Sequence, residues 1–176
     1  MFDTLLAVGT IALQIGIVFV IIAWISKQSF LSLIAKHSTL ILRVVFLASV
    51  IGSLVYSEIF DFAPCILCWY QRLAIFPITL LLFTGDLRRS ALLRAQILIF
   101  SSIGFAIALF HRYIELFPGA GIEVCGTDGV SCDTLYVMQF GYITIPMMSV
   151  TVLGLGILLT LLAKRFPQTP IAQGNQ

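Results

Sequence analysis

The chain has 176 residues, of which 60% are hydrophobic and 10% charged, with a net charge of +2 and a mean hydropathy of +1.07. A soluble domain is typically about 45–50% apolar and about 25% charged, so this composition could not cover a water-facing surface. The composition therefore excludes a soluble enzyme and predicts an integral membrane protein of one domain. A net charge this small gives no indication of nucleic-acid binding, and we expect none.

Five apolar segments are each long enough to cross about 30 Å of hydrocarbon as a helix. Only helices and closed barrels satisfy their backbone hydrogen bonds in lipid, and these segments are too long for barrel strands. The sequence thus predicts an all-α membrane protein. The five expected spans are Thr4 to Ser26, about Thr39 to Phe60, the first cysteine pair to about Gly85, about Ala91 to Tyr113, and about Ile143 to Ala163.

The first span is too long for the apolar part of a signal peptide and has no basic segment before it, so we expect it to be retained. After the fourth span comes a glycine-rich loop, residues 114–142, whose apolar last part, 135–142, we expect to lie along the membrane interface. The organisation expected is an N-terminal span with its connection (1–38), a four-span unit (39–166) and a disordered tail (167–176).

The positions of lysine and arginine predict the orientation, because cytoplasmic loops carry an excess of these residues. Two arginines, Arg72 and Arg112, fall at one set of helix ends. The other set holds Lys27, Lys36, Arg43, Arg88, Arg89, Arg94, Lys164 and Arg165. We therefore expect the N-terminus outside, the C-terminus in the cytoplasm and all four cysteines on the outer side of the membrane. Disulfides form and persist in that compartment.

Two of the cysteines, Cys65 and Cys68, have C-x-x-C spacing just before the third span. Such a pair can close a reducible disulfide or bind a metal. If the helix begins near Pro64, both lie in its first turn, where the helix dipole favours a thiolate. A structural disulfide is the alternative, although so short a loop stabilises a fold little.

Arg72 lies one turn deeper in the membrane, on the face of Cys68. An arginine at that depth must pair or face a polar cavity, and it could stabilise a thiolate or an anionic acceptor. A simpler interpretation is an arginine whose head reaches the interface.

The other cysteines, Cys125 and Cys132, enclose a pliable segment with an Asp-Gly turn. They could form an exposed disulfide that reacts with a soluble protein, or a plain structural one. A four-cysteine zinc site is a third possibility, which the wide spacing and the oxidising side disfavour. His111, at the outer end of the fourth span, could protonate a quinone-like acceptor or be an ordinary interfacial histidine.

The run from Cys65 to Arg72 resembles the motif of the DsbB family of membrane disulfide-bond formation proteins. The run from His111 to Pro118, followed by Cys125, is similar to the end of that family's third core helix and its second outer loop. The short loop from Cys125 to Cys132, followed by residues 140–146, is most similar to the BdbC-like branch. The resemblance covers about residues 39–163, so the first span is extra to the family's four-helix bundle.

This resemblance implies a thiol:quinone oxidoreductase. Cys125 and Cys132 would form the disulfide that oxidises a DsbA-like, thioredoxin-fold partner outside the cytoplasm, and Cys125 would exchange with Cys65. Cys68 would pass electrons to a bound quinone, either ubiquinone or menaquinone. Arg72 matches the family arginine that supports quinone binding, and His111 matches a histidine near that site. The resemblance implies no metal.

Two other functions fit parts of the pattern. A quinone or epoxide reductase of the vitamin K epoxide reductase kind also uses a C-x-x-C pair in a helical bundle. A non-catalytic membrane scaffold could use two disulfides to brace its outer loops. An epoxide substrate would identify the first, and cysteines that stay oxidised and never trap a partner would identify the second.

Overall fold

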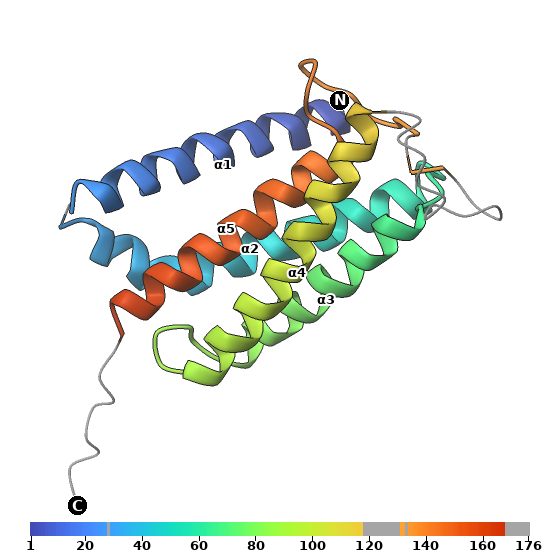
Figure 1. Cartoon of the computed structure of the whole chain (residues 1–176). Helices are drawn as coiled ribbons and strands as arrows, with labels where there is room; N and C mark the ends of the chain where they lie inside the picture. The colour runs from blue at the N-terminus through green and yellow to red at the C-terminus, as the bar shows by residue number, and fades with distance from the viewer. Residues whose placement is uncertain (28, 118–130, 133, 168–176) are drawn as a thin grey trace, which may run out of the picture.

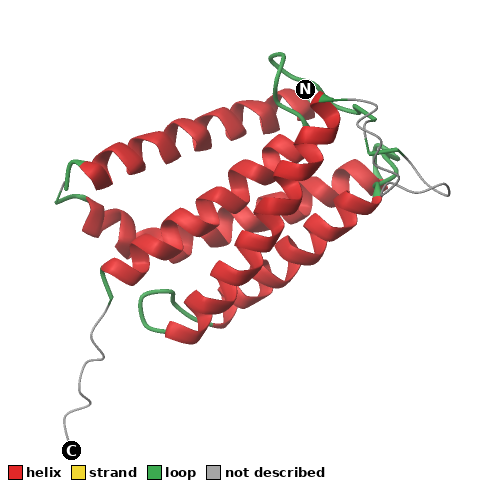
Figure 2. Cartoon of the chain, viewed as in Figure 1, coloured by secondary structure: helices red, strands yellow, loops and turns green. Residues whose placement is uncertain are grey.

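The structure is a computed structural model that describes residues 1–27, 29–117, 131–132 and 134–167. Its helices are α1 (Phe2–Ile25), α2 (Leu31–Glu58), α3 (Ile66–Thr84), α4 (Ala91–Leu116) and α5 (Ile145–Arg165) (Figure 1). Within these described ranges the only strand-like feature is an isolated bridge between Gln139 and Ile143, and Figure 2 shows helices joined by loops. Each of the five helices is long and apolar enough to cross a membrane. The predicted all-α fold with five spans is confirmed.

The second helix extends beyond the predicted span. We expected the second span to follow a polar connection and to begin at about Thr39, but α2 begins at Leu31. Lys36 and His37 therefore lie on the helix. The segment 31–38 contains no proline or glycine, and both Leu31 and Ala35, one turn apart, are buried. Packing of this face continues the helix past the charged residues, whose side chains point away from the core.

The helices alternate in direction, so the starts of α1, α3 and α5 lie at one end of the bundle (Figure 1). The N-terminus lies at this end, together with the loop before α3 and the loop before α5. The last described residues, after α5, lie at the opposite end. This arrangement agrees with the predicted separation of the termini, and the assignment of each end to a side of the membrane stays a prediction.

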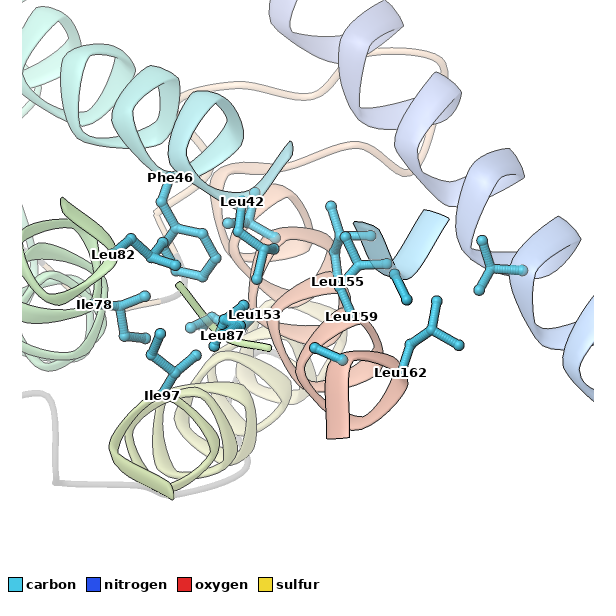
Figure 3. Close-up of a cluster of buried hydrophobic side chains, with 14 of the residues drawn as sticks. Leu42, Phe46, Ile78, Leu82, Leu87, Ile97, Leu153, Leu155, Leu159 and Leu162 are labelled. Atoms are coloured by element: carbon cyan, nitrogen blue, oxygen red, sulfur yellow. The ribbon is translucent and has the colours of Figure 1, made fainter. Parts of the chain in front are cut away.

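Helices α2 to α5 form a four-helix core in which α4 packs on α3 and α5, and α2 packs on the same two helices. Figure 3 shows the apolar side chains that meet between them. The fully buried ones include Leu42, Phe46, Ile78, Leu82, Ile97, Leu153 and Leu159. Many large apolar side chains on the outer faces are exposed, as expected for helices surrounded by lipid. Helix α1 lies outside this core, against α2 and α5.

A glycine in α4 allows three helices to approach closely. A Cβ atom on Gly104 would lie 2.7 Å from Cβ of Ala74 in α3 and 3.2 Å from the side chain of Leu153 in α5. Real Cβ atoms do not come within 3.0 Å of a neighbour, so no other residue fits here without moving a helix. This contact fixes the spacing of α3 and α4, which carry the site described next.

At the opposite end, Arg43 of α2 binds the C-terminus of α3. Its Nε donates to the carbonyl oxygen of Leu82 at 2.7 Å, and one Nη donates to that of Gly85 at 2.8 Å. The last carbonyls of a helix have no partner within the helix, and a cation there complements the helix dipole. The arginine thus satisfies buried backbone groups and holds α2 against α3.

Candidate active site

The C-x-x-C pair lies at the N-terminus of α3, with Cys65 as the N-cap and Cys68 in the first turn. The expectation that both would lie within the first turn is therefore off by one residue. Sγ of Cys65 accepts a hydrogen bond from the backbone N–H of Cys68 at 3.3 Å. The two sulfur atoms are 2.9 Å apart and the pair is reduced. The sulfur of Cys65 thus occupies the place of a capping oxygen, where free N–H groups favour negative charge.

Cys65 is buried and contacts His111 of α4, whose Nε2 lies 3.7 Å from the sulfur. The hydrogen bond with Cys68 is the largest influence on the pKa of Cys65 and lowers it. Burial opposes this effect, and the hydrogen bond with His111 adds to it. The net result is a pKa well below that of an ordinary thiol, so Cys65 is the thiolate of the reduced pair.

Two contacts fix the tautomer of His111. Its Nε2 lies 3.1 Å from the backbone oxygen of Cys132, which can only accept, so Nε2 carries the hydrogen. Its Nδ1 is then the acceptor of the neutral ring and receives a hydrogen bond from the Gln71 amide at 2.9 Å. His111 therefore points one N–H toward both Cys65 and the backbone of Cys132.

Cys132 lies beside the first pair. Its side chain is 1% exposed, and the residue is disulfide-bonded. Cys125, the other predicted cysteine of this loop, lies outside the described residues. A cavity of about 20 Å³, room for about one water molecule, is bordered by Cys65, Cys68, His111 and Cys132. The fold thus brings three of the four predicted cysteines, and the predicted histidine, to one place.

Arg72 reaches α2 on the other side of Cys68. Its Nε donates to Oγ of Ser53 at 2.8 Å, and one Nη donates to the backbone oxygen of Ser53 at 2.8 Å. The guanidinium carbon lies 5.2 Å from the ring centre of Trp69, in cation–π contact. These contacts hold the charged group in place within the apolar part of the bundle, with hydrogens left over for a ligand.

Arg72 and Cys68 border a second and much larger cavity of about 290 Å³. This volume is near the lower end for small-molecule sites. Helices α1, α2, α3 and α5 all contribute to its lining, most of which is apolar. An apolar cavity lined by one arginine and one cysteine suits a mostly apolar ligand that carries polar oxygens.

The two predicted cofactor-binding residues do not lie in the same cavity. Arg72 borders the large one, whereas His111 borders the small one, with Cys65. Which of them contacts an acceptor stays a prediction. Their separation depends on the register between α3 and α4, which no motif in either helix specifies.

Two polar residues of the site were missed from the sequence. Gln71 is 3% exposed and links the large cavity to His111. Glu115, also buried, accepts hydrogen bonds from Arg112 at 2.9 Å and from Thr144 at 2.7 Å. The sequence could have pointed to both. Gln71 is a polar residue inside a membrane helix, three positions after Cys68, and Glu115 lies four residues after His111 on the same helix face.

Cys65, Cys68 and His111 also place three possible metal-binding atoms within 4.8 Å of one another. Two sulfurs bound at about 2.3 Å to one tetrahedral zinc ion would lie roughly 3.8 Å apart. The 2.9 Å between the two sulfurs is shorter than this. The arrangement is therefore better suited to thiol chemistry than to holding zinc.

These features define a multi-pass membrane protein with a reactive cysteine pair between two cavities. The model of the family described as "Disulfide bond formation protein DsbB" matches residues 35–163, and the chain belongs to this family. The resemblance found in the sequence is confirmed, and α1 lies outside the matched residues. Family membership gives the chain a role in disulfide-bond formation as an oxidoreductase.

Several curated relatives carry names of the same kind. The chain is 37% identical over 121 residues to the SPbeta prophage-derived disulfide bond formation protein B of Bacillus subtilis (strain 168), which covers 66% of this chain and 81% of the relative. It is 40% identical over 111 residues to disulfide bond formation protein C of the same organism, covering 60% and 77%. A probable disulfide formation protein of Chlamydia pneumoniae is 35% identical over 119 residues, covering 68% and 85%. No solved structure matches the chain significantly.

Proposed function

We propose that the protein is a thiol:quinone oxidoreductase that reoxidises a thioredoxin-fold thiol oxidase outside the cytoplasm. Electrons would pass from the partner's thiols to Cys125 and Cys132, then to Cys65 and Cys68, and then to a membrane quinone. The observation that carries this proposal is the position of Cys68 between the two cavities. On one side are His111 and Cys132, and on the other are Arg72 and a space large enough for a quinone ring.

The first exchange takes place at the second cysteine pair. A thiolate of the reduced partner attacks the disulfide of Cys125 and Cys132, and its second thiolate then closes the partner's disulfide. The partner leaves oxidised by two electrons, and both cysteines of the loop become thiols. The burial of Cys132 beside the first pair keeps its thiol close to the next acceptor.

The second exchange takes place between the pairs. With Cys65 and Cys68 in their oxidised form, the Cys125 thiolate attacks Cys65 and Cys68 leaves as a thiolate. Attack of Cys132 on the resulting bond restores the loop disulfide and releases Cys65 as a thiolate. The hydrogen bond from His111 stabilises Cys65 as the leaving group of this last step, because a thiol of lowered pKa leaves faster.

Reoxidation of the first pair takes place at the large cavity. The quinone supplies the oxidising capacity, taking up two electrons and two protons. Cys68 faces its binding space, and Arg72 presents a fixed positive charge that favours a nearby thiolate and an electron-rich oxygen. The apolar remainder of the cavity excludes water from the reacting sulfur.

The direct test supplies the purified protein with a reduced thioredoxin-fold dithiol protein and a quinone, and follows quinone reduction by absorbance. The Cys68→Ser replacement is expected to abolish quinone reduction. Leu73→Ser is a suitable control because this side chain, on the same helix, is 68% exposed. If Cys68→Ser reduces quinone at the wild-type rate, the proposed electron path is wrong.

Two further measurements distinguish the remaining alternatives. Replacement Cys132→Ala should trap a mixed disulfide between Cys125 and the partner, and the absence of any such adduct would favour a scaffold. Stoichiometric zinc in the purified protein, lost on replacement of His111, would instead favour a metal site. The location we propose is a bacterial cytoplasmic membrane with both cysteine loops on its outer side.

A further inference from the structure

Helix α1 lies outside the residues that match the family, yet it forms part of the large cavity. Its lining residues recur every three or four positions, so they occupy one face of the helix. They are Leu5, Leu6, Gly9, Thr10 and Leu13. The opposite part of the lining comes from α3, with Cys68 and Arg72. A molecule that fills the cavity beside Cys68 would therefore contact α1.

Polar contacts determine where α1 lies on the bundle. Nε2 of Gln14 donates to Oγ1 of Thr151 in α5 at 3.0 Å, and Oε1 of Gln14 accepts from the hydroxyl of Tyr142 at 2.9 Å. An amide within the membrane is costly unless both of its ends are hydrogen-bonded. Gln14 therefore favours one rotation and one depth of α1.

A second contact holds the start of α1 against α2. The ring of Phe2 packs edge-on against that of Tyr56, with 5.6 Å between centroids. Near the same level, a Cβ on Gly52 would lie 3.5 Å from the Leu6 side chain, an ordinary contact distance. Nearer the other end of α1, the Arg165 guanidinium of α5 lies 5.8 Å from the ring centre of Trp24, and Val20 and Ala23 are buried. Helix α1 is nevertheless less buried than α5. These contacts hold α1 against the bundle, with its first half beside the cavity.

Gly9 leaves space at the centre of this wall. It lines the cavity, and no side-chain or distant backbone atom lies within 4 Å of the position that its Cβ would take. Gly9 is itself exposed, so a larger residue meets no steric clash there, and a side chain turned toward the cavity would occupy part of it. The absence of a side chain at this position therefore leaves room for a ligand in the cavity that Cys68 also borders.

We propose that α1 is a wall of the quinone site, in which Gly9 leaves room for the quinone and Gln14 holds the helix in place. The inference rests on the proposed function, since the ligand is the acceptor of that reaction. It makes the first helix a determinant of which quinone is used, through the space that its side chains leave beside Cys68.

The test compares Gly9→Leu with Gly16→Leu in the full-length protein. The two positions are seven residues apart, on nearly the same face of α1, and neither Cβ would meet another atom within 4 Å. Only Gly9 lines the cavity. The measurements are equilibrium binding of a decyl-ubiquinone and of a menaquinone analogue, and mapping of the peptide labelled by a photoreactive azidoquinone.

Gly9→Leu should weaken quinone binding by about tenfold or more, as expected when a side chain fills an apolar pocket. Gly16→Leu should bind within about twofold of the wild type, and the azidoquinone should label the first half of α1. Gln14→Leu should reduce this labelling, whereas Gln14→Asn should retain part of it. Electron transfer from the reduced partner to the protein, measured in one turnover without quinone, should be unchanged in both glycine variants.

Equal binding in the wild type and Gly9→Leu, or equal losses in Gly9→Leu and Gly16→Leu, would overturn the inference. Such results would leave the proposed function intact as long as Cys68→Ser is inactive. If Cys68→Ser still reduces quinone, the proposed function itself fails.

Discussion

The two sulfurs of the C-x-x-C pair are 2.9 Å apart but have different surroundings. Cys65 borders a cavity of about 20 Å³, near the His111 imidazole and the backbone of Cys132. Cys68 also borders the 290 Å³ cavity, which is mostly apolar and carries Arg72. Under the proposed function, Cys65 would exchange with another disulfide and Cys68 would contact a membrane-soluble acceptor. Helix geometry contributes to this asymmetry, because Cys65 and Cys68 are three positions apart at the start of α3.

The largest effect on activity is expected when one of the two sulfurs is removed. Both Cys65→Ser and Cys68→Ser should lower partner-dependent quinone reduction by at least about a thousandfold, because neither can complete the exchange. The two variants should nevertheless differ in what they trap. Cys68→Ser should accumulate a disulfide between Cys65 and the second loop, seen on non-reducing gels as two linked fragments after cleavage within residues 118–124. A disulfide between Cys68 and the second loop in Cys65→Ser would contradict the assigned order.

Replacement of Arg72 should affect the Cys68 side alone. Arg72→Met removes a charge held by two hydrogen bonds, and Arg72→Lys keeps the charge but loses the planar group. We expect the KM for quinone to rise by about tenfold or more in Arg72→Met, and by less in Arg72→Lys. The rate at which the reduced partner is oxidised in a single turnover should not change. A decrease in the rate of partner oxidation would show that Arg72 also affects the Cys65 side.

Replacement of His111 should affect the Cys65 side, with a dependence on pH. The pKa of Cys65 is lowered first by Cys68 and further by His111, so its thiolate is present at neutral pH and is lost as pH falls through this lowered value. His111→Ala removes one of the lowering contacts, so the pKa rises and the thiolate is lost at a higher pH. The acidic limb of the rate profile should move up by about one unit, while rates above about pH 9 change little.

Two controls accompany the histidine variant. His111→Gln retains an N–H donor and should restore part of the acidic-limb activity. Quinone binding should be unchanged in both variants if His111 serves Cys65. A selective loss of quinone binding would instead support its predicted place near the acceptor.

The smallest effect is expected at Gln71, which connects the two sides. Gln71→Leu removes the donor to Nδ1 of His111 and makes the large cavity slightly more apolar. One lost hydrogen bond contributes about 0.5–1.5 kcal/mol, so overall turnover should fall by about three- to tenfold. The acidic limb should shift in the same direction as in His111→Ala but by less. An unchanged pH profile would mean that the histidine is oriented by its other contacts.

Much of the fold was predictable from the sequence, because a membrane span depends mainly on local composition. The order of the spans and the position of the cysteine pair at the start of α3 required only hydropathy and helix geometry. That α2 begins as early as Leu31 was not predicted, because the charged Lys36 suggested a connection between spans. Burial of Leu31 and Ala35 instead extends the helix through this segment. Charge alone does not end a helix that still packs on one face.

The site was less predictable, because its contacts join helices far apart in the sequence. The approach of His111 to Cys65 across 46 positions depends on the register of α3 against α4. Gln71 and Gln14 could have been suspected, since a glutamine in a membrane span requires partners. Which partners they find is decided only when the helices pack.

The contact between Gly104 and Ala74 limits which substitutions this chain can tolerate. Gly104 lies two turns before His111 on the same face of α4, and a methyl group there would meet Ala74 at 2.7 Å. Such a group would push α4 away from α3 and move the His111 imidazole away from the Cys65 sulfur. A harmful substitution in this protein therefore need not involve a cysteine or touch either cavity. We expect low tolerance to mutation at Gly104 and Ala74, which take no part in the reaction but maintain the alignment of α3 and α4.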